Sequence, residues 1–265
     1  MMFKLKLLLL LSGALNISIA LAQSSDTAGT IEIRSKAENI TGIANSGSEG
    51  IVSGLRIAAL PILRPGEIME MVPGLIVTQH AGDGKANQYF LRGFNLDHGT
   101  DFATFVNGVP ANMPTHAHGQ GYTDLNFLIP ELVDQIAYRK GTYSALDGDF
   151  SAAGSARIEY LKKMDGHLAE LTAGANGYKR FLIAGSPKRI EGQWLYGLEV
   201  FRNDGPWVIP EKYQKINGVL SFTEGTRTNG YSLTGMLYKS SWVSTDQIPL
   251  RAVSQGIIDR FGSAD

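Results

Sequence analysis

The chain of 265 residues is 43% hydrophobic, which is enough apolar material to bury one or two cores of ordinary size. Its formal net charge of -1 leaves no basic excess to neutralise phosphates, so the composition argues against a nucleic-acid-binding protein. The lack of cysteine excludes disulfide bonds and thiolate metal sites, and the 31 glycines favour a β-rich structure with many turns.

The N-terminus has the pattern of a secretory signal peptide. Lys4 and Lys6 precede a leucine-rich run over residues 7–15, and Ala20-Leu21-Ala22 supplies small residues for cleavage. The apolar run is too short to remain as a membrane span. We therefore predict that residues 1–22 are removed and that the mature protein is exported to the periplasm or the outer membrane.

Residues 23–50 are rich in Ser, Thr, Gly, Ala and Asn, which predicts a flexible arm. One segment of this arm alternates as a strand would, and it consists of Thr30, Ile31, Glu32, Ile33 and Arg34. A tethered strand of this kind can pair with the sheet edge of a partner. The alternative is that these residues are an ordinary piece of the arm.

The region from 51 to 163 reads as a small α+β unit. Residues 51–72 approach helical spacing, with an interruption at Pro61 and a short helix predicted from Pro65 to Pro73-Gly74. Strands are predicted at residues 75–78, 89–94, 102–106, 135–139 and 157–161, and Asn107-Gly108 is a strong hairpin signal. Polar loops follow the first three strands, and a simple meander would place the first two loops at opposite ends of the sheet.

From His167 onward the pattern changes to long strands with two distinct faces. The alternating apolar sets, listed strand by strand, are Ala169, Leu171, Ala173 and Ala175; Trp194, Tyr196, Leu198 and Val200; Ile216, Leu220 and Phe222; and Tyr231, Leu233 and Leu237. Such strands suit the wall of a transmembrane β-barrel. A soluble β-sandwich alternates in the same way, and the signal peptide favours the membrane reading.

Four motifs in order resemble the plug of a TonB-dependent outer-membrane receptor. They are Val72-Pro73-Gly74-Leu75-Ile76-Val77, Phe90-Leu91-Arg92-Gly93-Phe94, Phe105-Val106-Asn107-Gly108-Val109-Pro110, and the strand and small-residue run over 133–156. The resemblance implies a plug domain at residues 51–163 and the first antiparallel strands of a transmembrane β-barrel at 164–265. Four or five strands are far fewer than the roughly 22 of a barrel wide enough to need a plug, so we expect an incomplete barrel and a fragment.

The resemblance also implies a function. It predicts an outer-membrane transporter that binds a scarce nutrient, most readily an iron-siderophore or another metal chelate, and imports it without a resident cofactor. The implied partners are outer-membrane lipid and the TonB protein of the inner-membrane energy complex, with residues 30–34 as the Ton box. The alternative is an exported ligand-binding β-module that does not transport. No nucleophile elbow, phosphate loop or HExxH pattern supports an enzyme.

The family pairs plug arginines with carboxylates of the barrel, which implies a lock between the two parts. Arg92 matches the first of these arginines. The second falls where this chain has Lys140, a departure that removes the forked guanidinium and could transfer the role to Arg139.

Four histidines, His80, His98, His116 and His118, fall in the three loops that the resemblance places at the substrate-facing end of the plug. With them, the candidate ligand contacts are Asp83, Tyr89, Asp97, Asn112, Gln120 and Tyr122. Neutral imidazoles with nearby carboxylates can bind a transition metal, and we predict His116 and His118 as metal ligands. Loop histidines that contact only solvent and the barrel are the alternative.

Overall fold

The computed structural model describes residues 43–44, 46–187, 192–226 and 229–263. The predicted signal peptide and the segment 30–34 lie outside these residues. Within the described chain, strands form sheets of six, five and three members.

The six-stranded sheet has the order β1-β2-β8-β9-β6-β7. Its strands are β1 (Ile43–Ala44), β2 (Glu49–Ser53), β6 (Phe102–Val106), β7 (Val109–Pro110), β8 (Val133–Arg139) and β9 (Gly154–Tyr160). The pairing of β6 with β9 is parallel, and the other pairings are antiparallel. The hairpin at Asn107-Gly108 is confirmed, with φ of 48° and 81° at its two turn residues.

The three-stranded sheet contains β3 (Leu75–Thr78), β4 (Gln88–Leu91) and β5 (Phe94–Asn95). Its second hairpin turns at Arg92-Gly93, where φ is 53° and 81°. The segment predicted as one strand over residues 89–94 is therefore two strands. Because β5 returns the chain in the direction of β3, the loops that follow β3 and β5 emerge at the same end of this sheet.

The segment before β3 differs partly from the helical prediction. Residues 51–53 belong to β2, because their backbone groups pair with β8, and only α1 (Gly54–Ala58) follows as an α-helix. The predicted helix at Pro65 is present as the 3₁₀ helix η1 (Pro65–Met71). The Glu67 carboxylate accepts hydrogen bonds from the backbone N–H groups of Leu63 and Arg64 at 2.9 and 3.1 Å, which satisfies donors at the start of this helix.

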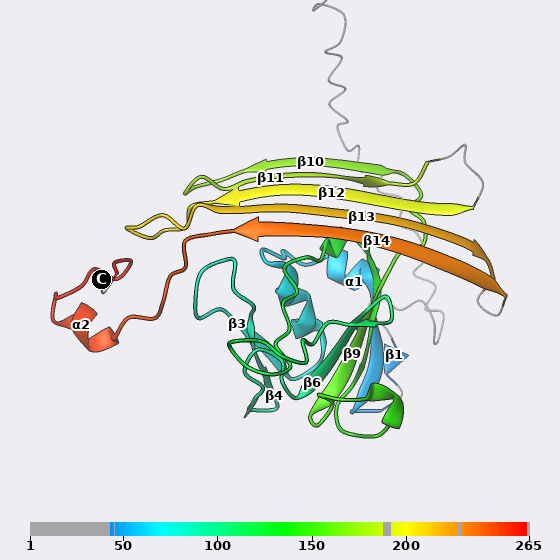
Figure 1. The fold of residues 1–265 in the computed structure, drawn as a ribbon, viewed down its shortest axis with the longest axis horizontal. Helices are drawn as coiled ribbons and strands as arrows, with labels where there is room; N and C mark the ends of the chain where they lie inside the picture. Colours follow the sequence, from blue (N-terminus) through cyan, green and yellow to red (C-terminus); the bar gives the residue numbers. More distant parts are fainter. Residues whose placement is uncertain (1–42, 45, 188–191, 227–228, 264–265) are drawn as a thin grey trace, which may run out of the picture. The chain divides into compact units, whose positions relative to one another are not determined.

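The remaining strands form one antiparallel layer in chain order (Figure 1). They are β10 (His167–Ala173), β11 (Lys179–Gly185), β12 (Gln193–Asn203), β13 (Tyr213–Gly225) and β14 (Gly230–Ser241). The short elements η2 (Pro130–Leu132), η3 (Ala145–Asp147) and α2 (Leu250–Ser254) complete the described fold. The fold class predicted from the sequence is confirmed: an α+β unit followed by antiparallel strands that do not close a barrel.

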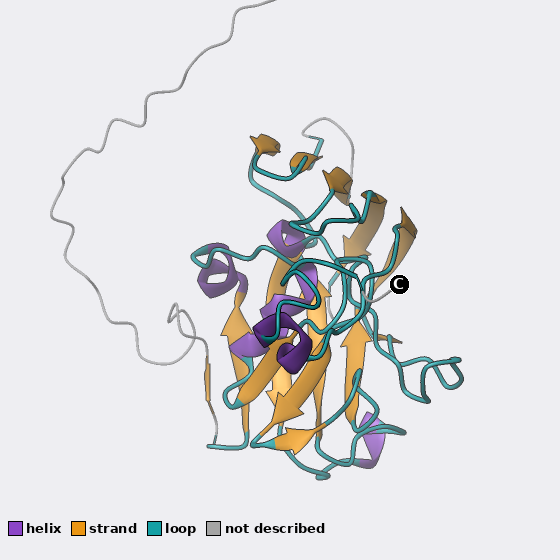
Figure 2. Ribbon diagram, turned by 90° about the vertical axis from the view of Figure 1, so that its left-hand side faces the viewer, coloured by secondary structure: helices purple, strands orange, loops and turns teal. Residues whose placement is uncertain are grey.

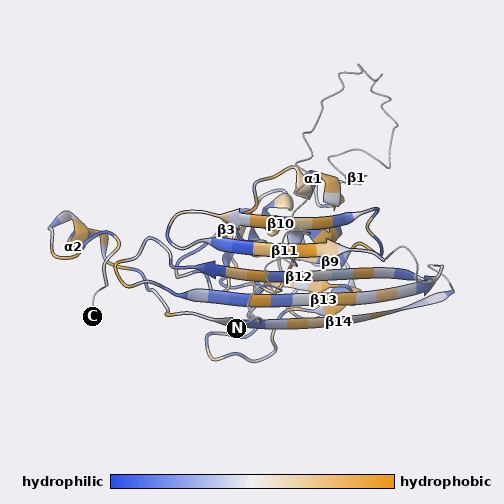
Figure 3. Ribbon diagram, turned by 90° about the horizontal axis from the view of Figure 1, so that it is seen from above, coloured by the Kyte–Doolittle hydropathy of each residue, from blue (hydrophilic) through white to orange (hydrophobic). Residues whose placement is uncertain are grey.

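The long strands expose one largely apolar face, whereas their buried face mixes polar and apolar side chains, and Figure 3 shows the changes of hydropathy along each strand. In β12, Leu198 and Val200 are exposed, whereas Glu199 is buried between them in sequence. In β13, Ile216 and Leu220 are exposed, whereas Asn217 is buried. The predicted apolar set therefore lies on the side away from the six-stranded sheet. No helix in the described residues combines the length and the apolar character that crossing a membrane requires.

The hydrophobic core continues from the N-terminal region, which contains β1–β9, into the layer β10–β14. Figure 2 shows helical turns between the two sets of strands. Leu132 of η2 belongs to the same buried cluster as Leu182 and Leu195 of the layer, and all three side chains are fully buried. The approach is close at Gly197, where an added Cβ would lie 2.8 Å from Leu132 Cδ1. A side chain at this position would separate η2 from β12.

Candidate functional site

Four histidines from three loops meet at one end of the N-terminal region. His80 follows β3, His98 follows β5, and His116 and His118 lie in the long loop after β7. The rings of His98 and His118 have centroids 4.4 Å apart, and those of His80 and His98 are 4.9 Å apart. The return of the chain through β5 explains this convergence, which the predicted meander did not provide.

His98 is the fixed centre of this cluster. Its side chain is 2% exposed, and its Nδ1–H donates a hydrogen bond to the Asn87 carbonyl at 2.9 Å. This bond places the proton on Nδ1, so the Nε2 lone pair of the neutral ring is available. His98 Nε2 lies 3.1 Å from His80 Nε2, which can donate a hydrogen bond to it. Burial lowers the pKa of His98, so the neutral form is favoured.

His118 and Asp97 complete the group that surrounds this lone pair. The ligand atoms of Asp97, His98 and His118 all lie within 4.8 Å of one another, and the Asp97 carboxylate is 3.8 Å from His98 Nε2. His116 does not belong to this group. Its ring stacks on Tyr122 with centroids 4.0 Å apart, and its Nδ1 accepts a hydrogen bond from the His118 backbone N–H.

The loops that carry these side chains are joined by hydrogen bonds of the backbone and of one buried amide. The Thr123 N–H donates to the His98 carbonyl at 2.8 Å. Asn112 is 7% exposed, accepts a bond from the Thr104 N–H and donates to the carbonyl groups of Gly99 and Gly121. Asn112 was predicted as a ligand contact, but its hydrogen-bonding groups already hold the loops together.

The side chains of two other predicted contacts have different surroundings. Tyr89 is 3% exposed, and burial strongly raises the pKa of its hydroxyl, so it is a residue of the core. Asp83 accepts a hydrogen bond from Arg64 Nε at 3.2 Å on the side facing β12 and β13. Gln120 and Tyr122 do border the cluster, and both line the small cavity beside Asp97.

Comparison with known proteins assigns the N-terminal region. Residues 41–155 match the family described as the TonB-dependent receptor plug domain. We call residues 41–155 the plug domain after this match.

Solved structures show the fold of the plug domain together with strands like β10–β14. The copper transporter OprC matches with a TM-score of 0.56 and 17% identity, over 78% of this chain and 33% of that chain. The siderophore receptor PirA from Acinetobacter baumannii matches with a TM-score of 0.52 and 16% identity, over 74% of this chain and 32% of that chain. The pyoverdine receptor FpvA from Pseudomonas aeruginosa PAO1 matches with a TM-score of 0.52 and 17% identity, over 74% of this chain and 28% of that chain. The chain thus spans a third or less of the length of each.

Among the described residues, the hydrogen bonds and ion pairs of the three predicted lock residues stay within the plug domain, and their pairing with barrel carboxylates stays a prediction. Arg92 is exposed in the β4–β5 turn. Arg139 pairs with Glu49 and Asp147 inside the plug domain, at 3.4 and 3.0 Å. Lys140 is 6% exposed and donates to the Pro73 carbonyl at 3.1 Å, and burial lowers its pKa. The partner of Arg139 is local because β8 and η3 are joined by a short loop.

An ion-pair network of the opposite polarity joins the plug domain to the strands. Arg180 of β11 makes a bidentate contact with the Glu131 carboxylate of η2, at 2.7 and 3.0 Å. Arg180 Nε also donates to Glu199 at 2.7 Å, and Lys215 lies 2.8 Å from the second oxygen of Glu199. Sequence reasoning missed this network. The available signal was the placement of Glu199 and Lys215 on the face opposite the apolar set.

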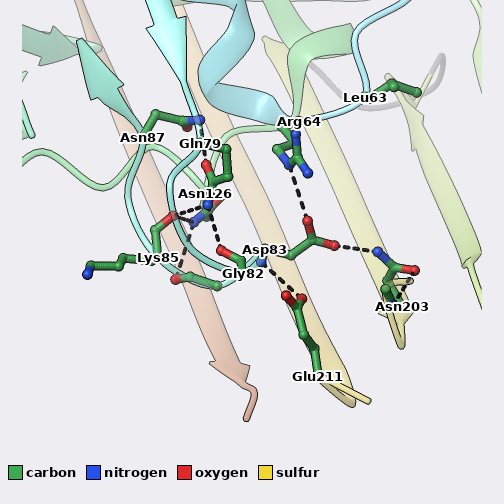
Figure 4. Close-up of polar contacts among 12 residues, drawn as sticks. Leu63, Arg64, Gln79, Gly82, Asp83, Lys85, Asn87, Asn126, Asn203 and Glu211 are labelled. Carbon is green, nitrogen blue, oxygen red and sulfur yellow. Dashed lines mark hydrogen bonds and ion pairs between the residues drawn. The ribbon is translucent and has the colours of Figure 1, made fainter. Parts of the chain in front are cut away.

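A second polar contact joins the loop after β3 to the strands, as Figure 4 shows. The Asp83 carboxylate lies between Arg64 of the plug domain and Asn203 of β12, with hydrogen bonds to both. The Asp83 N–H donates to the Glu211 carboxylate at 3.1 Å. A cavity of about 520 Å³ lies between this contact and the Arg180 network, and residues of both groups line it.

Proposed function

We propose that the protein acts as a TonB-dependent outer-membrane receptor that binds a scarce nutrient and imports it into the periplasm. The observation that carries this proposal is the seating of the plug domain on one face of β10–β14, where buried apolar residues lie beside the buried polar residues Glu199 and Asn217, while the opposite face exposes apolar side chains. A strand layer with polar groups on its inner face and an apolar outer face suits a barrel wall between lumen and lipid.

The expected nutrient is a metal chelate such as an iron-siderophore. The histidine cluster lies in the loops that match the substrate-facing end of the plug, where imidazole, carboxylate and amide groups can contact such a ligand. The names of the similar structures, a copper transporter and siderophore receptors, are consistent with this class of substrate.

The energy for release of the bound nutrient into the periplasm would come from the TonB protein. TonB would pair with the segment 30–34 as an added strand and then pull on it. An exported, non-transporting β-module is the alternative. It is disfavoured by the exposed apolar face, because a soluble protein seldom leaves so large an apolar surface uncovered.

Deletion of residues 30–34 tests the proposal directly. The detergent-solubilised protein should bind the purified periplasmic domain of TonB, and the deletion should remove this binding. A matched deletion of residues 24–28, in the same arm, should leave binding unchanged. Equal binding by both deletion variants would contradict the Ton-box assignment. Recovery of the protein in the soluble periplasmic fraction without detergent would contradict the outer-membrane receptor as a whole.

A further inference from the structure

The plug domain contains a cavity the size of a single ion at the histidine cluster. It measures about 10 Å³ and is lined by Asp97, His98, His118, Gln120 and Tyr122, among others. A space of this size is close to what one water molecule occupies. The side chains around it offer two imidazoles and one carboxylate, and the ligand atoms of these three side chains lie within 4.8 Å of one another.

We propose that Asp97, His98 and His118 form a binding site for one divalent first-row transition metal ion at the substrate-facing end of the plug domain. The proposal rests on the proposed receptor function and narrows its substrate to a metal that takes nitrogen ligands. The ion would be cargo, held on its way through the receptor.

The fixed orientation of His98 is the first argument for this site. Its Nδ1–H is held by the Asn87 carbonyl, so Nε2, 3.8 Å from the Asp97 carboxylate, keeps its lone pair. A backbone carbonyl on the far nitrogen is the usual support of a metal-ligating histidine, because it fixes both tautomer and ring orientation. The buried ring of His98 therefore has the arrangement of a ligand before any ion arrives.

The mobility of the other two ligands is the second argument. Two nitrogen ligands of a tetrahedral zinc ion, each about 2.0–2.1 Å from it, are about 3.3 Å apart. The Asp97 carboxylate is already 3.8 Å from His98 Nε2. Asp97 and His118 are both exposed, so small rotations can close the remaining distance and leave a path for the ion from solvent.

In the metal-free protein, His80 is the hydrogen-bond partner of the His98 Nε2 lone pair. Its Nε2 lies 3.1 Å from His98 Nε2, a separation close to that of two ligands on one ion. In the absence of metal the His80 N–H satisfies the buried nitrogen, so the site is stable without cargo. Metal binding replaces this hydrogen bond.

The ligand set indicates the class of metal. Imidazole nitrogen suits zinc, copper and nickel, whereas magnesium and calcium take oxygen ligands almost entirely. Without cysteine in the chain, thiolate sites for soft ions are excluded. Divalent zinc, copper or nickel, with one carboxylate in the coordination sphere, fits these residues better than a fully oxygen-coordinated ion.

The test is a calorimetric titration: zinc chloride is added to the purified, EDTA-treated protein in detergent, and the heat of binding is measured. We expect one ion to bind per chain. His118→Ala and Asp97→Asn should each weaken binding by at least about tenfold, the lower end of what loss of an outer-shell partner costs. His167→Gln, which changes a histidine of β10 whose ring is bonded to Tyr196 and is not part of the cluster, should bind as the unaltered protein does.

Cobalt titration gives a second measurement, because visible absorption of bound Co²⁺ reports nitrogen ligation and should be lost in His118→Ala. Failure of the unaltered protein to bind zinc would overturn the proposal, as would affinities within twofold for all variants. Both altered side chains are exposed, and circular dichroism verifies that each variant is folded. A negative titration with normal TonB binding refutes only the metal site, whereas normal zinc binding without TonB binding refutes the receptor function.

Discussion

The Glu131–Arg180 pair offers the sharpest test of how the plug domain is held. The side chain of Arg180 is 12% exposed and that of Glu131 is 28% exposed, so water screens this pair only in part. Hydrogen bonds between charged groups contribute about 1.5–3 kcal/mol, and breaking one partner of a fully buried pair costs about 3–5 kcal/mol. Because Glu131 is partly exposed, we expect the lower range for Glu131→Gln, a loss of about 1.5–3 kcal/mol in the free energy of unfolding.

A double-mutant cycle isolates this pair from the rest of the network. Arg180→Gln alone also removes one of the two cations beside the buried Glu199, so its cost in free energy of unfolding should exceed that of Glu131→Gln. The double variant should recover about 1–2 kcal/mol relative to the sum of the two single changes. Urea unfolding of the detergent-solubilised protein, followed by tryptophan fluorescence, supplies the four free energies of unfolding.

The matched control for this cycle is Glu159→Gln. Glu159 is an exposed carboxylate of β9 that accepts one hydrogen bond from Gln135. Glu159→Gln should therefore lower the free energy of unfolding by less than about 0.5 kcal/mol. A coupling energy between Glu131 and Arg180 below the same value would refute the reasoning, since the network would then not hold the plug domain to the strands.

The remaining predictions concern packing and charge at single positions. Gly197→Val should lower the free energy of unfolding by about 1–3 kcal/mol, because its side chain would enter the space of Leu132; an unchanged urea midpoint would show that η2 does not rest on β12. Gly84→Ala should shift Trp242 fluorescence, because an added Cβ would overlap the indole ring, whereas Gly166→Ala, with open space around it, should not. Burial raises the pKa of Asp124, so the native state binds its proton more tightly and stability from this group falls as the pH rises above about 4. Asp124→Asn should therefore raise the urea midpoint at pH 7 and lose this advantage near pH 4; equal midpoints at pH 7 would contradict the assignment.

Local signals made much of the plug domain predictable. The strand at Phe102–Val106 has the bounds predicted, because a run of apolar and β-branched residues ends at the hairpin signal Asn107-Gly108. The alternation in β12 and β13 predicted which face is apolar, because it depends only on the period of the strand. The strand β5 was not predicted because two residues are too few to carry a pattern.

The candidate site depends on contacts that sequence spacing does not determine. The convergence of His80 and His98 follows from the turn at Arg92-Gly93, and the exclusion of His116 follows from its stacking on Tyr122. Asp83 and Asn112 were named for their chemistry alone; the partners of Asp83 on the strand side are 120 or more positions away, and those of Asn112 are carbonyl and N–H groups of the backbone, which no side-chain pattern predicts. No periodicity relates Glu131 to Arg180, because the two residues are 49 positions apart.

The path of force through the plug domain links the proposed Ton box to this ion-pair network. A pull on the arm would act first on the short β1–β2 pairing, which has two residue pairs, and then on β2, whose five residues pair with β8. The helix η2 precedes β8 without a loop, so displacement of β8 acts directly on Glu131.

The contact at the end of this path has two parts that respond differently to separation. Carboxylate and guanidinium regain hydration when they part, which offsets much of the lost attraction. The Leu132 contact with β12 gains no such compensation, because apolar surface exposed to water costs about 25 cal/mol per Å². The apolar contact should therefore resist release more than the ion pairs do, and the ion pairs should mainly determine where the plug domain reseats.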